Sequence, residues 1–280
     1  MRISLLALLA VATTVAARVP AASAQTKPTI AVKKQVVYGE VRGSGLLADL
    51  AYPEGQKGIP AIMYIHGGRW SSSNRGNANS QALAKWADQG FFTMSIDYRL
   101  VNATPAPAAY EDALCAIRWL HAHAEEYGVD PDRIYLIGES SGGHFVSLVA
   151  TLGAGPYAKT GGWENARSDV RAVISVAGTY DLNTLSWGNL WTPLTGDPIE
   201  ARRQASPLFH ITPQTKPILV IHSDDDRSVP VQQALDFVKA LDATPVQHRF
   251  VHYTDRGHMG LTEEVLREAR AFIDEVEKKK

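Results

Sequence analysis

The sequence predicts an α/β fold, in which a mostly parallel sheet of eight strands carries helices on both faces. Short β-rich segments alternate with helical segments along the chain, which is typical of parallel strands joined by helical crossovers. The middle β-rich segments are almost continuously apolar, as a sheet covered on both faces requires. With 280 residues, 45% of them hydrophobic, the chain is long enough to bury one sizeable core.

The predicted strands and helices follow one another in a simple order. The strands are expected at residues 35–41, 46–53, 59–66, 91–98, 133–138, 170–178, 216–223 and 246–253. A Gly-Ser-Gly turn joins the first two strands and predicts a hairpin. The helical patterns lie at about residues 80–89, 109–127, 141–152, 231–241 and 262–278. In such a sheet, functional residues collect in the loops that follow the carboxyl ends of the strands.

Residues 1–24 have the pattern of a secretory signal peptide. Arg2 provides a basic start, residues 5–17 are apolar, and Ala22-Ser23-Ala24 forms a small-residue cleavage site. The alternative is a membrane anchor, but this apolar run is shorter than the roughly 20 residues that span a bilayer. We therefore expect a secreted or periplasmic protein that leaves the membrane after cleavage, with residues 25–280 forming a single domain.

Composition argues against several classes of partner. Loss of Arg2 and Arg18 with the leader takes the formal charge from −1 to −3, which is too weak to indicate nucleic acid or an anionic membrane. We find neither a phosphate-binding glycine loop nor a metal-ligand spacing, so no cofactor and no metal are expected. Cys115, the only cysteine, lies in an apolar helical setting that indicates packing. The oligomeric state stays open.

The segment from Gly138 to Gly142 joins a predicted strand to a predicted helix. Its sequence, Gly-Glu-Ser-Ser-Gly, fits G-x-S-x-G, the pattern of a nucleophile elbow. Such a turn projects the hydroxyl of Ser140 above the sheet, and the residues two before and two after it are small because backbone segments crowd there. A glycine-rich turn that only changes the chain direction is the alternative, so the pattern needs partners elsewhere in the sequence.

Candidate partners for Ser140 follow in the required chain order. A serine nucleophile needs a histidine as general base and a carboxylate that orients the histidine. Asp224, Asp225 and Asp226 follow a predicted strand, and His258 lies in a glycine-flanked turn after the last strand. His222 precedes the acidic turn and His252 lies within a predicted strand, so both are weaker candidates than His258.

A fourth strand end provides amides for an oxyanion. Residues Gly67 and Gly68 follow the strand at 59–66, and amides without side chains can approach a tetrahedral intermediate closely. The amide of Ser141, directly after the nucleophile, is expected to join them. A purely structural glycine turn explains the Gly-Gly pair alone, but it does not explain four motifs at four strand exits.

These motifs resemble the α/β-hydrolase superfamily, and within it bacterial esterases of the feruloyl and acetylxylan type and hormone-sensitive-lipase-like carboxylesterases. The resemblance covers roughly the whole mature chain. The segments that carry it are HGGRW (66–70), DYRL (97–100), AIRWLHAHAEEYGVDPDRIYLIGESSGGH (116–144), SPL (206–208), HSDDDRSVP (222–230) and GH (257–258). It implies an α/β-hydrolase fold with small cap-like insertions, and a catalytic triad of Ser140, His258 and Asp226, the aspartate three residues before Val229.

The chain departs from these esterases at two places. Arg69 stands where a third glycine often follows His-Gly-Gly, and Ser223 stands where His-Gly often precedes the acidic turn. The side chain of Arg69 either narrows the acyl side, contacts a polar substrate or points to solvent. These three interpretations stay open.

Two irregular segments, residues 153–165 and 180–205, are longer than ordinary connections. Their larger aromatic residues are Tyr157, Trp163, Trp187 and Trp191. Such rings either stack on a sugar or a phenolic acyl group, or they form the core of a small cap.

The resemblance implies an exported serine esterase that forms an acyl-enzyme and acts on short-chain or aromatic acyl esters, including esters on carbohydrates. An amide hydrolase of the peptidase or arylformamidase type is the alternative enzyme on the same fold. A non-catalytic binding protein with this fold is the alternative outside enzymes, and such proteins usually lack a triad member.

We predict that the mature protein recovered from an exporting host begins at Gln25. The small residues that precede it suit a signal peptidase, and Lys27-Pro28 does not continue a helix. Amino-terminal sequencing or intact mass of the exported fraction checks this expectation. Exported protein that still begins at Met1 or Arg2 would contradict it.

Overall fold

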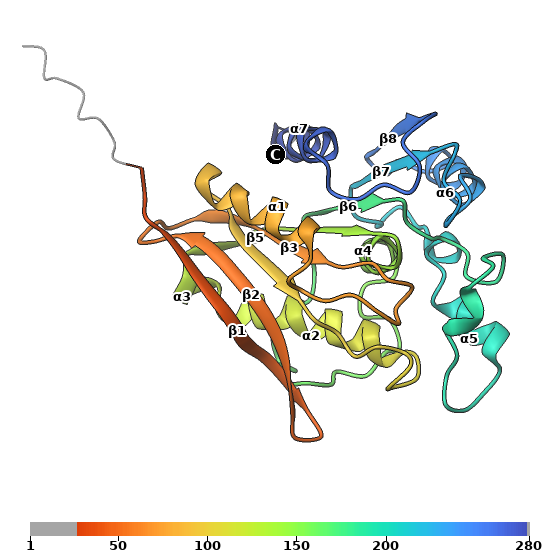
Figure 1. Ribbon diagram of the computed structural model, residues 1–280, viewed down its shortest axis with the longest axis horizontal. Coiled ribbons are helices and arrows are strands. Elements are labelled where there is room, and N and C mark those ends of the chain that lie inside the picture. Colours follow the sequence, from red (N-terminus) through yellow and green to blue (C-terminus); the bar gives the residue numbers. More distant parts are fainter. Residues whose placement is uncertain (1–26, 279–280) are drawn as a thin grey trace, which may run out of the picture.

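The computed structural model describes residues 27–278, which form one eight-stranded sheet between two layers of helices (Figure 1). The strands are β1 (Ile30–Val41), β2 (Ser44–Pro53), β3 (Ile59–Ile65), β4 (Phe92–Ile96), β5 (Val129–Glu139), β6 (Ala172–Val176), β7 (Ile218–Ser223) and β8 (His248–Tyr253). They lie in the order β1-β2-β4-β3-β5-β6-β7-β8. Strand β2 pairs antiparallel with β1 and β4, and the remaining pairs are parallel, so the predicted α/β fold is confirmed. The predicted signal peptide lies outside the described residues.

The helices cover both faces of the sheet. They are α1 (Ala78–Ala84), α2 (Ala108–Ala122), α3 (Ala124–Tyr127), α4 (Ser141–Thr151), α5 (Pro198–Gln204), α6 (Gln232–Asp242) and α7 (Glu263–Lys278), with 3-10 turns η1 (Lys85–Gln89), η2 (Gly188–Leu190) and η3 (Pro207–His210). Residues of α2, α4 and α6 pack on one face, whereas residues of α1, η1 and α7 pack on the other.

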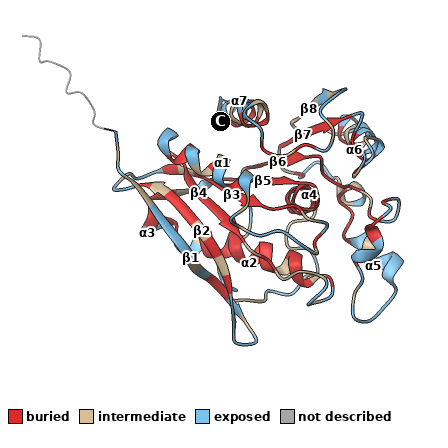
Figure 2. Ribbon diagram, viewed as in Figure 1, coloured by how far each residue is buried: buried red, intermediate tan, exposed pale blue. Residues whose placement is uncertain are grey.

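Side-chain alternation along the strands divides the core into these two layers. In β3, Met63 and Ile65 belong to the cluster beneath α2 and α4, whereas Ile62 and Tyr64 belong to the cluster beneath α7. All four side chains are fully buried. Figure 2 shows the same burial along the central strands, with exposed residues concentrated on β1 and around α5. The continuous apolar runs of the sequence therefore reflect a sheet buried on both faces.

Two local features differ from the sequence-based expectation. The helix predicted at 109–127 is interrupted at His123, whose ring hydrogen-bonds to the carbonyl of Trp119 at 2.8 Å and stacks on its indole. Helix α5 lies inside the segment 180–205 that was expected to be irregular. Asp197 caps α5 by accepting the N–H of Ile199, and Pro198 occupies its first turn.

The sheet brings the predicted motifs to one edge. In the parallel register, Ile65 at the end of β3 pairs with Gly138 of β5, and Glu139 pairs with Val176 of β6. The ends of β7 and β8 also coincide, since Ser223 pairs with Tyr253. The loops that carry the candidate residues therefore leave the sheet at the same edge, as expected for parallel strands.

Cys115 is buried in α2, and burial raises the pKa of its thiol to about 11, which agrees with a packing role. Within residues 27–278, the helices are too short or too polar to serve as membrane spans.

Candidate active site

Ser140 occupies a strained turn between β5 and α4. Its backbone has a φ of 55° and a ψ of −121°, a conformation that residues other than glycine rarely adopt. Its N–H donates to the carbonyl of Val176 at 2.9 Å, which ties the turn to β6. A Cβ on Gly138 would lie 2.4 Å from the Gly142 oxygen, and one on Gly142 would lie 2.0 Å from the oxygen of Ile65. Backbone crowding thus explains both glycines of the motif.

Ser140 and His258 line one pocket of about 350 Å³. Nδ1 of His258 lies 2.8 Å from Oδ2 of Asp226, which leaves Nε2 as the ring nitrogen without a hydrogen bond to any described residue. The other oxygen of Asp226 accepts the N–H groups of Ser228 at 2.8 Å and Val229 at 2.9 Å. The structure thus brings Ser140, His258 and Asp226 to one place, and their role as a triad stays a prediction.

The environment of Asp226 keeps its carboxylate ionised. Burial acts to raise its pKa, but the hydrogen bonds from His258, Val229 and Ser228 outweigh burial and hold the pKa below its usual range. A carboxylate that is negative and oriented stabilises the imidazolium that forms when His258 takes a proton.

The three adjacent aspartates make separate contacts. Asp224 is exposed and its Oδ1 lies 2.6 Å from Nε2 of His252. Oδ1 of Asp225 accepts the hydroxyl of Ser223 at 2.6 Å and the N–H of Gly257 at 2.7 Å. Of the three, Asp226 is the one that contacts His258.

His222 lies behind the site rather than in it. The side chain is fully buried, and its Nε2 contacts the carbonyl of Val229 at 2.9 Å and Oδ2 of Asp226 at 3.4 Å. Burial lowers the pKa of His222, so the ring is neutral near neutral pH. A buried neutral ring packed on the acid does not replace His258 as the base.

The amide of Gly67 has a different role from the one predicted. It donates to Oε1 of Glu139 at 2.9 Å, and the same oxygen accepts the hydroxyl of Tyr64 at 2.8 Å. Because this N–H is already bonded, the expectation that Gly67 contributes to the oxyanion site is corrected. Sequence reasoning missed Glu139, although it is the bulky side chain within an otherwise small-residue turn.

Three amides close to Ser140 in the chain or in the loop after β3 have no hydrogen-bond acceptor among the described residues; Gly68 and Arg69 line the pocket, and Ser141 directly follows Ser140. Within the described residues, the N–H groups of Gly68, Arg69 and Ser141 make no hydrogen bond. The loop has positive φ at three successive residues, 108° at Gly68, 53° at Arg69 and 58° at Trp70. The N–H of Trp70 donates to Oγ of Ser141 at 3.1 Å, which fixes the far end of the loop beside the nucleophile.

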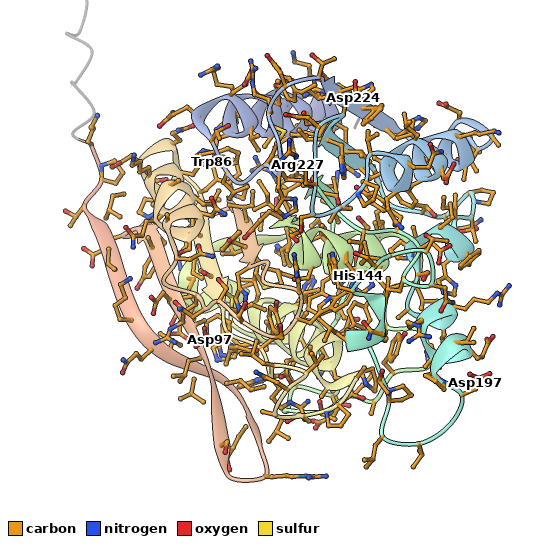
Figure 3. The ribbon with its side chains drawn as sticks, turned by 45° about the vertical axis from the view of Figure 1, so that its right-hand side comes forward. Trp86, Asp97, His144, Asp197, Asp224 and Arg227 are labelled. Atoms are coloured by element: carbon orange, nitrogen blue, oxygen red, sulfur yellow. The ribbon has the colours of Figure 1, made fainter. Side chains whose placement is uncertain are left out.

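An aromatic cluster supports this loop. The indole N–H of Trp70 donates to Nδ1 of His144 at 3.2 Å, and the opposite ring nitrogen donates to the carbonyl of Ala205 at 2.6 Å. Burial lowers the pKa of His144 to about 4, so this buried ring stays neutral. Trp187 and Trp191 pack on Trp70 with ring centroids 4.8 Å and 5.3 Å away, and both are buried. Figure 3 places His144 on α4, in the interior of the molecule.

The two irregular segments therefore have different roles. Trp187 and Trp191, from residues 180–205, form a small core against the loop after β3. In residues 153–165, the indole N–H of Trp163 donates to the carbonyl of Tyr38 at 2.8 Å. Neither Trp163 nor Tyr157 lines the pocket, so the structure favours packing over substrate stacking for both segments.

Within residues 27–278, no group of three or more His, Cys, Asp or Glu side chains is arranged to hold a metal ion. The chemistry that this pocket offers is nucleophilic attack by a hydroxyl, assisted by an imidazole and by backbone amides.

Comparison with known proteins relates the chain to esterases. The BD-FAE family model matches residues 48–241. The probable carboxylic ester hydrolase LipM of Mycobacterium tuberculosis is 34% identical over 193 residues, which cover 65% of this chain and 44% of LipM. Esterase LipC of the same organism is 29% identical over 75% of this chain and 55% of its own length. The chain thus spans about half the length of these curated relatives.

Solved structures share the fold. A truncated form of a carbohydrate esterase from gut microbiota superposes with a TM-score of 0.78 at 24% identity, covering 90% of this chain and 98% of that one. At this identity the likeness concerns the α/β-hydrolase fold.

We predict that Asp226→Asn lowers kcat for ester hydrolysis by several orders of magnitude and leaves KM little changed. Loss of an orienting carboxylate with its shape retained can lower turnover about ten-thousand-fold. Asp224→Asn and Asp225→Asn serve as matched controls and should stay within about tenfold of wild type, because an amide oxygen can still accept the bonds made by Asp225. Steady-state kinetics of the three variants check this. Loss of activity in Asp224→Asn or Asp225→Asn, with activity retained in Asp226→Asn, would show that one of the other two aspartates is the triad acid.

We also predict that Glu139→Ala lowers kcat about a hundredfold. The amide of Gly67 loses its acceptor, so the neighbouring amides are no longer held in position. Glu139→Gln should retain most activity, since its amide oxygen can accept both existing bonds. Tyr64→Phe removes the other bond to Glu139, together with the bond that the Tyr64 hydroxyl accepts from Asn77 at 2.9 Å, and is the control for general disruption. Wild-type kcat in Glu139→Ala would show that this carboxylate does not position the loop.

Proposed function

The chain belongs to the BD-FAE family, and we propose that it is a serine esterase that hydrolyses carboxylic esters and, from the leader pattern of residues 1–24, that it is exported. The observation that carries the proposal is the pocket that Ser140, at its strained turn, lines together with His258, whose Nδ1 lies 2.8 Å from Asp226. The names of the relatives, carboxylic ester hydrolase and esterase, support the same reaction.

In the proposed mechanism, Nε2 of His258 takes the hydroxyl proton of Ser140 while Oγ attacks the ester carbonyl. The carbonyl oxygen becomes an oxyanion that the N–H groups of Gly68 and Ser141 stabilise, and Arg69 offers a third amide. Collapse breaks the ester bond, and His258 returns the proton to the departing alcohol. Water then attacks the acyl group on Ser140 with His258 again as the base, which releases the acid and restores the enzyme.

We propose short-chain or aromatic acyl esters as substrates, including esters carried on carbohydrates. The polar side chains of Asn79 and Ser228 line the pocket and suit a hydroxyl-rich alcohol. The leader pattern of residues 1–24 supports a secreted or periplasmic location. A panel of para-nitrophenyl esters, acetylated xylan, methyl ferulate and aminoacyl anilides separates esterase activity from the alternative amide hydrolysis.

We predict that Ser140→Ala abolishes ester hydrolysis and leaves the fold intact, because Ser140 lines the pocket and its hydroxyl makes no hydrogen bond to a described residue. An organophosphonate probe should label the wild type at Ser140, and mass spectrometry locates the adduct. Labelling at another residue, or full activity in the variant, would remove Ser140 from the mechanism. Binding of substrate without any turnover by the wild type would favour a non-catalytic binding protein.

A further inference from the structure

Arg69 brings an unpaired positive charge to the pocket. Its side chain is exposed and lines the pocket together with Ser140 and His258. Among the ion pairs of residues 27–278 none includes Arg69, and its guanidinium donates no hydrogen bond to a described residue. By contrast, Arg256 nearby in the His258 loop pairs with Asp255 and Glu264.

The backbone of Arg69 is strained by the presence of this side chain. Its φ of 53° lies in the left-handed region, which glycine adopts freely and an arginine adopts at a cost in conformational free energy. Its N–H is available to the pocket whichever residue stands here, so the backbone role does not require arginine. Strain of this kind at a reaction site indicates a function for the side chain that carries it.

Trp187 gives the guanidinium a fixed platform. The guanidinium carbon lies 5.8 Å from the centroid of the Trp187 ring, within cation–π range. That ring is itself held, because its N–H donates to the carbonyl of Ser228 at 2.9 Å and it packs at a tilt against Trp70. Since Ser228 also lines the pocket, the platform places the charge at the pocket rim.

The carboxylate of Glu139 is buried and does not lie beside Arg69 at the rim of the pocket. Glu139 is the carboxylate among the lining residues, and its exposed fraction is 8%. Its Oε1 is engaged by Gly67 and Tyr64, and its Oε2 is shielded from solvent. A ligand that enters the pocket therefore meets a guanidinium with free donors before it meets any carboxylate.

We propose that Arg69 binds a free carboxylate of the substrate, so that the pocket prefers esters that carry a second, unesterified carboxylate near the scissile bond. This inference rests on the esterase function proposed above. A guanidinium matches a carboxylate with two parallel N–H···O bonds, which an ammonium group does not reproduce. The carboxylate belongs to the acyl group or to the alcohol, and these two sources need separate tests.

The test uses two pairs of esters that match in shape and differ in charge. Monoethyl succinate against ethyl 4-methylpentanoate places the charge on the acyl side, whereas 4-acetoxybenzoate against 4-isopropylphenyl acetate places it on the alcohol side. The measured quantity is the ratio of kcat/KM for the charged ester to that for the neutral ester. Hydrolysis rates are measured from the release of acid, for the wild type, Arg69→Gln, Arg69→Lys and Arg69→Glu.

Arg227→Gln is the matched control, because Arg227 is exposed, lies beside Ser228 and has no ion pair within the described residues, yet does not line the pocket. Thermal unfolding of each variant confirms that the fold is retained.

We expect Arg69→Gln to lower the ratio about tenfold in one of the two pairs, mainly through KM, because a remote charge contact binds ground state and transition state alike. Arg69→Lys should retain part of the preference, Arg69→Glu should reverse it, and Arg227→Gln should leave it unchanged. Added salt should reduce the wild-type ratio. Ratios in Arg69→Gln that equal the wild-type ratios in both pairs would overturn the inference alone, whereas absence of hydrolysis of all four esters by the wild type would overturn the esterase function with it.

Discussion

The backbone of Ser140 is the constraint on which the rest of the site depends. A serine at a φ of 55° and a ψ of −121° costs on the order of 1–3 kcal/mol, and the surrounding structure must compensate. On the sheet side of the turn, Val176 of β6 accepts the N–H of Ser140, and the end of β3 lies close against Gly142. From above, α4 begins directly after the turn and its N–H at His144 donates to the carbonyl of Ser140 at 3.0 Å. The buried core on both sheet faces thus sustains a conformation that a loop alone could not hold.

The two neighbours of Ser140 extend this rigidity to the loop after β3. Glu139 accepts the amide of Gly67 at one end, and Ser141 accepts the amide of Trp70 at the other. Between these two bonds lie Gly68 and Arg69, both with positive φ and with unbonded amides. The turn of the proposed nucleophile and the amides proposed to bind the oxyanion are therefore linked by hydrogen bonds at both ends of the loop, which favours preorganised donors.

The sequence predicted those parts of the molecule that depend on pattern and chain order. The strand–helix alternation and the apolar strands predicted the sheet and its eight strands, and strand exits located Ser140 and His258. The role of Gly67 was not predictable, because whether a glycine amide is free depends on a carboxylate 72 residues later in the chain. Likewise, the burial of Trp187 and Trp191 depends on Trp70, which lies more than a hundred residues earlier. Long-range pairing of this kind leaves no periodic signal in the sequence.

The acidic loop after β7 follows the same design as the turn at Ser140. Asp225, next to Asp226, accepts the N–H of Gly257, next to His258, and Ser223 accepts the N–H of Arg256 at 2.9 Å. Residues close in sequence to Asp226, the proposed acid, thus hydrogen-bond to residues beside His258, the proposed base. Glu139 and Ser141 contact the loop after β3 in the same way. Three carboxylates in succession are therefore not redundant, because each has its own partner: a surface histidine, a backbone amide and the imidazole. The residues beside the proposed reacting groups thus determine the geometry in which those groups meet.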